Sequence, residues 1–135
     1  MFNTIKSNLK FVMLADGGIS LFAGAALAGL SSFVAGLLGP AFSANAVFSI
    51  GIFLLGWGIF HIVAGRTNQV PSGAVKIAIL GDALWVTASI GLLVADWNAL
   101  TSLGIAVIAV LALAVADIGL LKLIGLNAGP KPALA

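Results

Sequence analysis

Four long stretches of the chain are apolar at nearly every position, and short polar segments separate them. The stretches run approximately over residues 9–38, 46–64, 75–95 and 99–126. A helix rises about 1.5 Å per residue, so about 20 apolar residues cross the hydrocarbon core of a membrane, which is about 30 Å thick. Each stretch is therefore predicted to be a transmembrane helix.

The segments between the stretches contain residues that end helices. Gly39-Pro40 follows the first stretch, and Asp96-Trp97-Asn98 separates the last two. A membrane β-barrel would instead need segments of about ten residues in which apolar and polar positions alternate. Residues 107–115 are apolar at both parities. The pattern therefore predicts an all-α polytopic membrane protein, a single four-helix bundle over residues 1–135.

The composition agrees with this class. Of the 135 residues, 61% are hydrophobic and 7% are charged, whereas soluble domains contain roughly 25% charged residues. Cysteine is absent, which excludes disulfides, thiolate metal sites and thiol nucleophiles. The cations are scattered singly, so no basic cluster indicates binding to nucleic acid.

The positions of the cations predict the orientation, because Lys and Arg in short loops stay on the cytoplasmic side. All six cations flank the spans on one side, and the two opposite connections contain none; the six are Lys6, Lys10, Arg66, Lys76, Lys122 and Lys131. Both termini are therefore predicted to be cytoplasmic.

An N-terminal signal peptide is an alternative interpretation of the first stretch. Lys6 and Lys10 precede an apolar run, and Ala23-Gly-Ala25 or Ala26-Leu-Ala28 has the small residues of a cleavage site. However, Asp16-Gly17-Gly18 interrupts the apolar region, which favours a retained first span.

Small residues recur every four positions in two of the predicted spans. In lipid, helices associate through close packing of small residues, since apolar surface alone gives no incentive. The series indicates packing within the bundle or, alternatively, a homo-oligomer or contact with another membrane subunit. Its members are Ser20, Gly24, Ala28, Ser32 and Gly36 in the first span and Ala83, Thr87, Gly91 and Ala95 in the third.

Three spans carry an aspartate at a similar depth. Helical rise places Asp16 and Asp82 about 10 Å, and Asp117 about 13 Å, from the predicted cytoplasmic boundary. His61 lies slightly shallower on the same side. Because ionisable groups in a membrane face the bundle interior and pair with one another, these four residues are candidates for a proton- or cation-binding cluster.

A structural role is the competing interpretation of the same residues. In this case, the carboxylates bond neighbouring hydroxyls and amides, or pair near the interface with Lys10, Lys76 and Lys122. Lys122 is predicted to extend towards the membrane surface rather than to form a Schiff base, because it lies a few residues from a helix end.

Other chemistry has less support. One histidine without cysteine does not supply a transition-metal site, so neither a metal nor a cofactor is predicted. No spacing brings a nucleophile and a base together, so no enzymatic activity is expected. Trp57 and Trp85 lie deeper than the interfacial belt and are candidates for contact with an apolar pigment, quinone or lipid.

Four short segments combine small, polar and apolar residues in a distinctive way: Asp16-Gly-Gly-Ile-Ser-Leu21, Asp82-Ala-Leu-Trp-Val-Thr-Ala-Ser89, Thr101-Ser-Leu-Gly104 and Val115-Ala-Asp117. In these segments the chain resembles a group of small uncharacterised bacterial four-helix membrane proteins. The resemblance covers most of the chain. It implies the four-span fold and a location in the bacterial inner membrane, and it implies no activity.

The sequence leaves three hypotheses of function. The first is a non-enzymatic bundle that acts through helix contacts, as an accessory subunit or homo-oligomer. The second is a transporter that couples a proton or cation to a small solute through the aspartate cluster. The third is binding of an apolar pigment, quinone or lipid.

Overall fold

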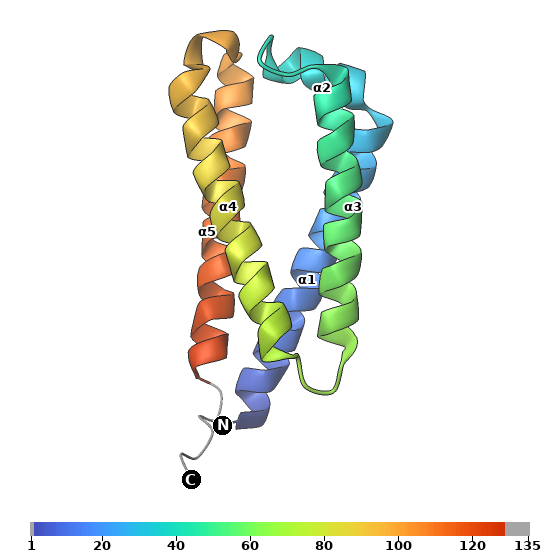
Figure 1. The fold of residues 1–135 in the computed structure, drawn as a ribbon, viewed down its shortest axis with the longest axis vertical. Coiled ribbons are helices and arrows are strands. Elements are labelled where there is room, and N and C mark those ends of the chain that lie inside the picture. Colours follow the sequence, from blue (N-terminus) through green and yellow to red (C-terminus); the bar gives the residue numbers. More distant parts are fainter. Residues whose placement is uncertain (1, 129–135) are drawn as a thin grey trace.

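The computed structural model describes the backbone of residues 2–128 and the side chains of residues 8–128, and within this range it is all-α. The four long helices are α1 (Phe2–Gly29), α3 (Ala44–Arg66), α4 (Ser72–Ala95) and α5 (Ser102–Asn127). A short helix, α2 (Ser31–Leu38), and a 3₁₀ turn, η1 (Trp97–Ala99), lie at one end (Figure 1). Each long helix is apolar and long enough to cross a membrane, which indicates a multi-pass membrane protein.

The predicted first span, residues 9–38, is divided in the structure. Leu30 leaves helical geometry, with φ −119° and ψ 26°, and α2 continues in a new direction (Figure 1). The amide of Leu30 still donates to Ala26 O, and the amide of Val34 to Leu30 O, both at 2.9 Å. The 22-residue candidate span within α1 suffices to cross a membrane, so the remaining apolar residues are free to form α2.

The other helices begin and end within a few residues of the predicted boundaries. Side-chain caps explain two of the starts. Ser43 Oγ accepts a hydrogen bond from the amide of Ala46 at 3.1 Å, and Thr101 Oγ1 accepts one from the amide of Gly104 at 2.9 Å. Each cap satisfies an amide that has no partner inside its helix.

The long helices form two pairs. Contacts are most extensive between α1 and α3 and between α4 and α5, and the ribbons of the two pairs approach each other towards the end where α3 joins α4 (Figure 1). We call the end where α3 joins α4 and α5 finishes the basic end, because it carries Lys10, Arg66 and Lys76. The opposite end, with α2 and η1, is the loop end. Lys131 and the side chain of Lys6 lie outside the described residues.

Glycines allow the backbones of α1 and α3 to come into direct contact. A Cβ placed on Gly24 would lie 2.8 Å from Gly51 O, and one on Gly58 would lie 2.8 Å from Gly17 O. Gly17 and Gly24 are seven residues apart, as are Gly51, Gly58 and Gly65. Seven residues nearly complete two helical turns, so these glycines stay on one face.

The four-residue series predicted for helix packing is only partly inside the bundle. Gly24 and Ala28 lie at the α1/α3 contact with Gly51, and Ser20 is buried beside Asp16. The other members are directed outwards: Ser32, Ala83, Thr87 and Ala95 are exposed, and Gly36 and Gly91 face open space. A four-residue step drifts around the helix, so packing within the bundle is the wrong interpretation for these six.

Backbone hydrogen bonds join the two helix pairs at the loop end. The amide of Ala41 donates to Ala99 O, and the amide of Thr101 donates to Leu38 O, both at 2.9 Å. Gly39 makes this approach possible because its φ is +114° and a Cβ there would lie 2.7 Å from Ala99 O.

We predict that Gly51→Ala destabilises the protein, because the new methyl would lie 2.6 Å from the backbone amide nitrogen of Ala28. Overpacking of this kind costs about 1–3 kcal/mol in the free energy of unfolding, which denaturation in mixed micelles measures. Gly56→Ala is the matched control on the same helix, since Gly56 has nothing within 4 Å. Equal stability of the two variants would contradict the close α1/α3 contact.

Candidate functional site

One ionisable side chain from each long helix meets near the basic end. Lys122 of α5 donates hydrogen bonds to Asp16 Oδ2 of α1, to Asp82 Oδ2 of α4 at 2.7 Å, and to His61 Nε2 of α3 at 3.1 Å. Lys122 and His61 are completely buried, and Asp16 and Asp82 are 9% and 5% exposed. An ammonium carries three hydrogens, and here each hydrogen has an acceptor on a different helix.

His61 is held so that its Nε2 can act either as an acceptor or as a donor. Its Nδ1 lies 2.9 Å from Trp57 O, and because a carbonyl only accepts, Nδ1 carries a hydrogen. Nε2 lies 3.1 Å from both Lys122 Nζ and Asp16 Oδ2. A neutral ring accepts from Lys122, and a protonated ring donates to Asp16. Both protonation states therefore fit the same arrangement of heavy atoms.

The cluster carries an uncompensated formal charge. Two carboxylates and one ammonium sum to −1 when His61 is neutral, and to zero when His61 is protonated. A net charge away from water is costly unless it is paired. Uptake of one proton therefore brings this buried group to neutrality.

Neighbouring residues fix the carboxylates and the imidazole. Ser20 Oγ donates to Asp16 Oδ1 at 3.4 Å, one turn further along α1. Gly119 leaves room for Asp82, since a Cβ at Gly119 would lie 3.3 Å from Asp82 Oδ2. The ring of Trp57 meets that of His61 edge-on, with centroids 4.9 Å apart. These contacts pre-position the groups that bind Lys122.

Asp117 does not join the other two aspartates. It is exposed on α5 and forms no ion pair among the described side chains. Lys122 follows it by five residues, which turns the helix by about 500°, so the two side chains are about 140° apart around α5. The expectation that Asp117 faces the same way as Asp16 and Asp82 is therefore wrong, and its depth in the membrane stays a prediction.

The position of Lys122 near a helix end predicted that its side chain extends to the surface. This prediction is wrong, because Lys122 is completely buried. It points into the bundle because two carboxylates and an imidazole accept its hydrogens there. The structural interpretation of Asp16 and Asp82 predicted that they pair with Lys10, Lys76 or Lys122. In the structure both pair with Lys122. Lys10 and Lys76 form no ion pair in the described part of the chain.

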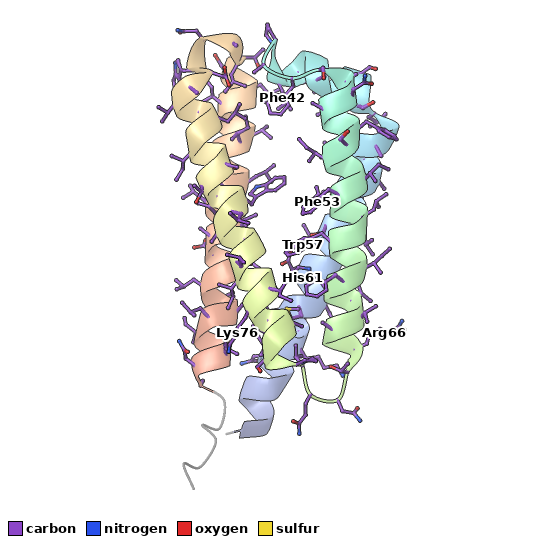
Figure 2. All side chains as sticks on the ribbon, in the orientation of Figure 1. Phe42, Phe53, Trp57, His61, Arg66 and Lys76 are labelled. Atoms are coloured by element: carbon purple, nitrogen blue, oxygen red, sulfur yellow. The ribbon has the colours of Figure 1, made fainter. Side chains whose placement is uncertain are left out.

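A cavity of about 290 Å³ lies between the two helix pairs and reaches the cluster. Its walls include Asp16, Asp82, Trp57 and Trp85, so both tryptophans proposed as ligand contacts border it. Figure 2 shows Phe53, Trp57 and His61 on the side of α3 that faces the other pair.

A second cavity, of about 270 Å³, extends the interior space towards the loop end. It is bordered by Phe42 and Ser89, and it shares Trp85 and Leu111 with the first cavity. Trp85 Nε1 is buried and has no hydrogen-bond partner among residues 8–128. The two cavities are therefore neighbours, and only the first borders the cluster.

The described residues contain no group of three or more His, Cys, Asp or Glu arranged to hold a metal ion. The ammonium of Lys122 instead occupies the position between the two carboxylates.

Comparisons with known protein families, curated proteins and solved structures found no match. The resemblance to small bacterial four-helix membrane proteins therefore stays a prediction, and function must be argued from the site itself.

We predict that Lys122→Met strongly destabilises the protein, because it keeps the length of the side chain but leaves two buried carboxylates without a counter-charge. Breaking a buried ion pair from one side costs about 3–5 kcal/mol, measured as the free energy of unfolding. Lys76→Met is the control, since Lys76 is exposed on α4. The triple variant Asp16→Asn/Asp82→Asn/Lys122→Met should regain most of the loss. A loss no larger than that of Lys76→Met would argue against the cluster as a stabilising contact.

Proposed function

We propose that the protein is a proton-coupled carrier of a small solute across a membrane. The observation that carries the proposal is the buried cluster of Asp16, His61, Asp82 and Lys122, which has a formal charge of −1 with His61 neutral and borders a cavity between the helix pairs. Ionisable groups within a membrane are costly, and they commonly mark ion or proton pathways.

The hydrogen bonds of the cluster provide a way to couple protonation to helix contact. When His61 gains a proton, its Nε2 donates to Asp16 and stops accepting from Lys122. One hydrogen of Lys122 then loses its acceptor, and this changes the bonding between the α1/α3 pair and the α4/α5 pair. The bond of Lys122 to Asp82 within the α4/α5 pair is kept, and the α1/α3 pair gains the bond from His61 to Asp16, so the two pairs are suited to move relative to each other as units.

We further propose that the basic end lies in the cytoplasm of a bacterial cell, with the protein in the inner membrane and both termini cytoplasmic. This orientation is supported by Lys10, Arg66 and Lys76, which gather at that end, because cations in short loops stay on the cytoplasmic side. The cluster would then exchange protons with the cytoplasm.

Proton uptake tests the proposal directly. Purified protein in lipid nanodiscs, in weak buffer, is brought from weakly alkaline to weakly acidic pH, and bound protons are counted. Asp16→Asn, Asp82→Asn and His61→Gln should each take up about one proton fewer than the parent. The two aspartate variants remove the excess negative charge that the proton neutralises, and His61→Gln removes the group that accepts the proton. Asp117→Asn is the matched control, because it makes the same substitution outside the cluster. It should keep the proton uptake that the cluster variants lose.

Transport is then measured in liposomes that contain a pH-sensitive dye and face an imposed pH gradient. A panel of small amines, carboxylates and sugars is added in turn. Proton flux that depends on one of these solutes is expected for the parent and for Asp117→Asn, and should be lost in the three cluster variants. If the cluster variants behave like the parent in both assays, the cluster is purely structural.

A second function, assembly through helix contacts, is favoured by the outer surface of the α4/α5 pair. The small side chains of Ala83 and Thr87 are exposed there, Gly91 faces open space, and Asp117 is exposed on α5. A carboxylate at such a depth costs about 2.5–3.5 kcal/mol on insertion scales. We propose that a second copy or another membrane subunit covers this surface.

We predict that Gly91→Leu weakens such an assembly, because a large side chain blocks the close approach that small residues allow. Native mass measurement in mild detergent should show an oligomer for the parent and mainly monomer for Gly91→Leu. Gly56→Leu on α3 is the control, since Gly56 also faces open space. A parent protein that is monomeric in several detergents and in nanodiscs would argue against self-assembly.

A further inference from the structure

The polar wall of the cavity beside the cluster is acidic. Of the four cluster residues, only the carboxylates Asp16 and Asp82 border the cavity, and the hydroxyl of Ser20 lies next to them. Lys122 and His61 do not border it and are completely buried. A ligand in this cavity therefore meets the negative side of a group whose formal charge is −1.

The remaining walls are apolar and rich in aromatic rings. Phe53, Trp57 and Trp85 border the cavity, and the rings of Phe53 and Trp57 are stacked with centroids 5.8 Å apart. The face of an aromatic ring attracts a cation, and the attraction is stronger where water is excluded. Trp57 is also stacked with Phe60, with centroids 5.3 Å apart, so Phe53 and Trp85 are the rings whose faces would favour the same charge in the ligand as the carboxylates do.

Asp82 has lone pairs available for such a ligand. Its Oδ2 accepts from Lys122 at 2.7 Å, and no hydrogen bond to its Oδ1 is found among residues 8–128. Asp16 is more fully engaged, since its Oδ2 accepts from Lys122 and its Oδ1 accepts from Ser20. Asp82 is therefore the better anchor for a positive group.

We infer that this cavity binds a small organic monocation with an apolar, aromatic body, and that the cation and a proton on His61 are alternative ways of neutralising the cluster. The inference deepens the proposed function by naming the class of solute. A neutral ligand would leave the charge of −1 in place, and an anion would raise it to −2. The volume of about 290 Å³ suits a body with one aromatic ring rather than a drug-sized molecule.

The alternation follows from the groups that face His61. Asp16 of α1 and Lys122 of α5 each lie 3.1 Å from His61 Nε2. Asp82 of α4 is linked to His61 through Lys122. With a cation beside Asp82, the sum of charges is already zero, and a proton on His61 would make it +1. Binding of the cation should therefore release the proton.

Benzyltrimethylammonium is the probe, because its charge is permanent and a change of pH then acts only on the protein. Neopentylbenzene has the same shape without the charge. Binding to the protein in nanodiscs is measured by calorimetry and by tryptophan fluorescence, and proton release is measured in weak buffer. We expect the cation to bind at least roughly tenfold more tightly than the neutral analogue, to release close to one proton, and to bind more weakly as pH falls.

Matched variants locate the site. Asp82→Asn should weaken binding of the cation by roughly tenfold and abolish proton release, whereas Asp117→Asn should change neither. Trp85→Leu should weaken binding, whereas Trp97→Leu, at an exposed position in η1, should not. Asp16→Asn removes the same charge and replaces Asp82→Asn in the test if the latter does not fold.

The outcomes separate this inference from the proposed function. If neopentylbenzene binds as tightly as the cation, or if binding of the cation is unaffected by both aspartate variants, the solute class is wrong even when proton uptake by the cluster is observed. If the cation binds through Asp82 without releasing a proton, the solute class stands and the proton-coupled function fails.

Discussion

The ammonium of Lys122 is the contact on which the arrangement of the four long helices depends. Its three hydrogens bind acceptors on α1, α3 and α4, so a single side chain from α5 reaches each of the other long helices. Apolar surface gives helices in lipid little reason to associate. The ammonium of Lys122 supplies such a reason, because its acceptors lie on the other three long helices. An unpaired charge in the membrane is far more costly than a leucine exposed to lipid.

The contacts within and between the helix pairs differ in kind, and the cavity follows from this difference. Within the α1/α3 pair, glycines such as Gly24 and Gly51 bring the backbones together over several turns. Between the pairs, the polar contacts are those of Lys122 near the basic end and the backbone bonds of Ala41 and Thr101 at the loop end, and Met13, Ala64 and Ala78 add a small buried apolar cluster. Two pairs joined at their ends leave space between, and the cluster forms one wall of that space.

The sequence predicts depth along a membrane helix better than direction around it. Runs of apolar residues predicted the four long helices, and helical rise predicted the similar level of Asp16 and Asp82, which bind the same ammonium. The direction in which a side chain points can be predicted only if one knows which face of its helix packs against a neighbouring helix. Asp117 and Lys122 are five residues apart on α5 and about 140° apart around it, and only the inward direction of Lys122 decides which belongs to the cluster. The seven-residue spacing of Gly51 and Gly58 was a directional signal for α3, whereas the four-residue series drifts.

The formal charge of the cluster supports the proposal of a site that exchanges charge over that of a site that only holds helices together. One carboxylate and Lys122 would form a neutral pair, which is the cheaper way to fasten helices within a membrane. The second carboxylate adds a negative charge that no described side chain compensates, and His61 is placed where one added proton removes it. Because the excess is one unit and the carboxylates border a cavity, a proton and a monovalent cation are equivalent partners for it. A purely structural cluster has no need of that excess, whereas a coupled carrier depends on it.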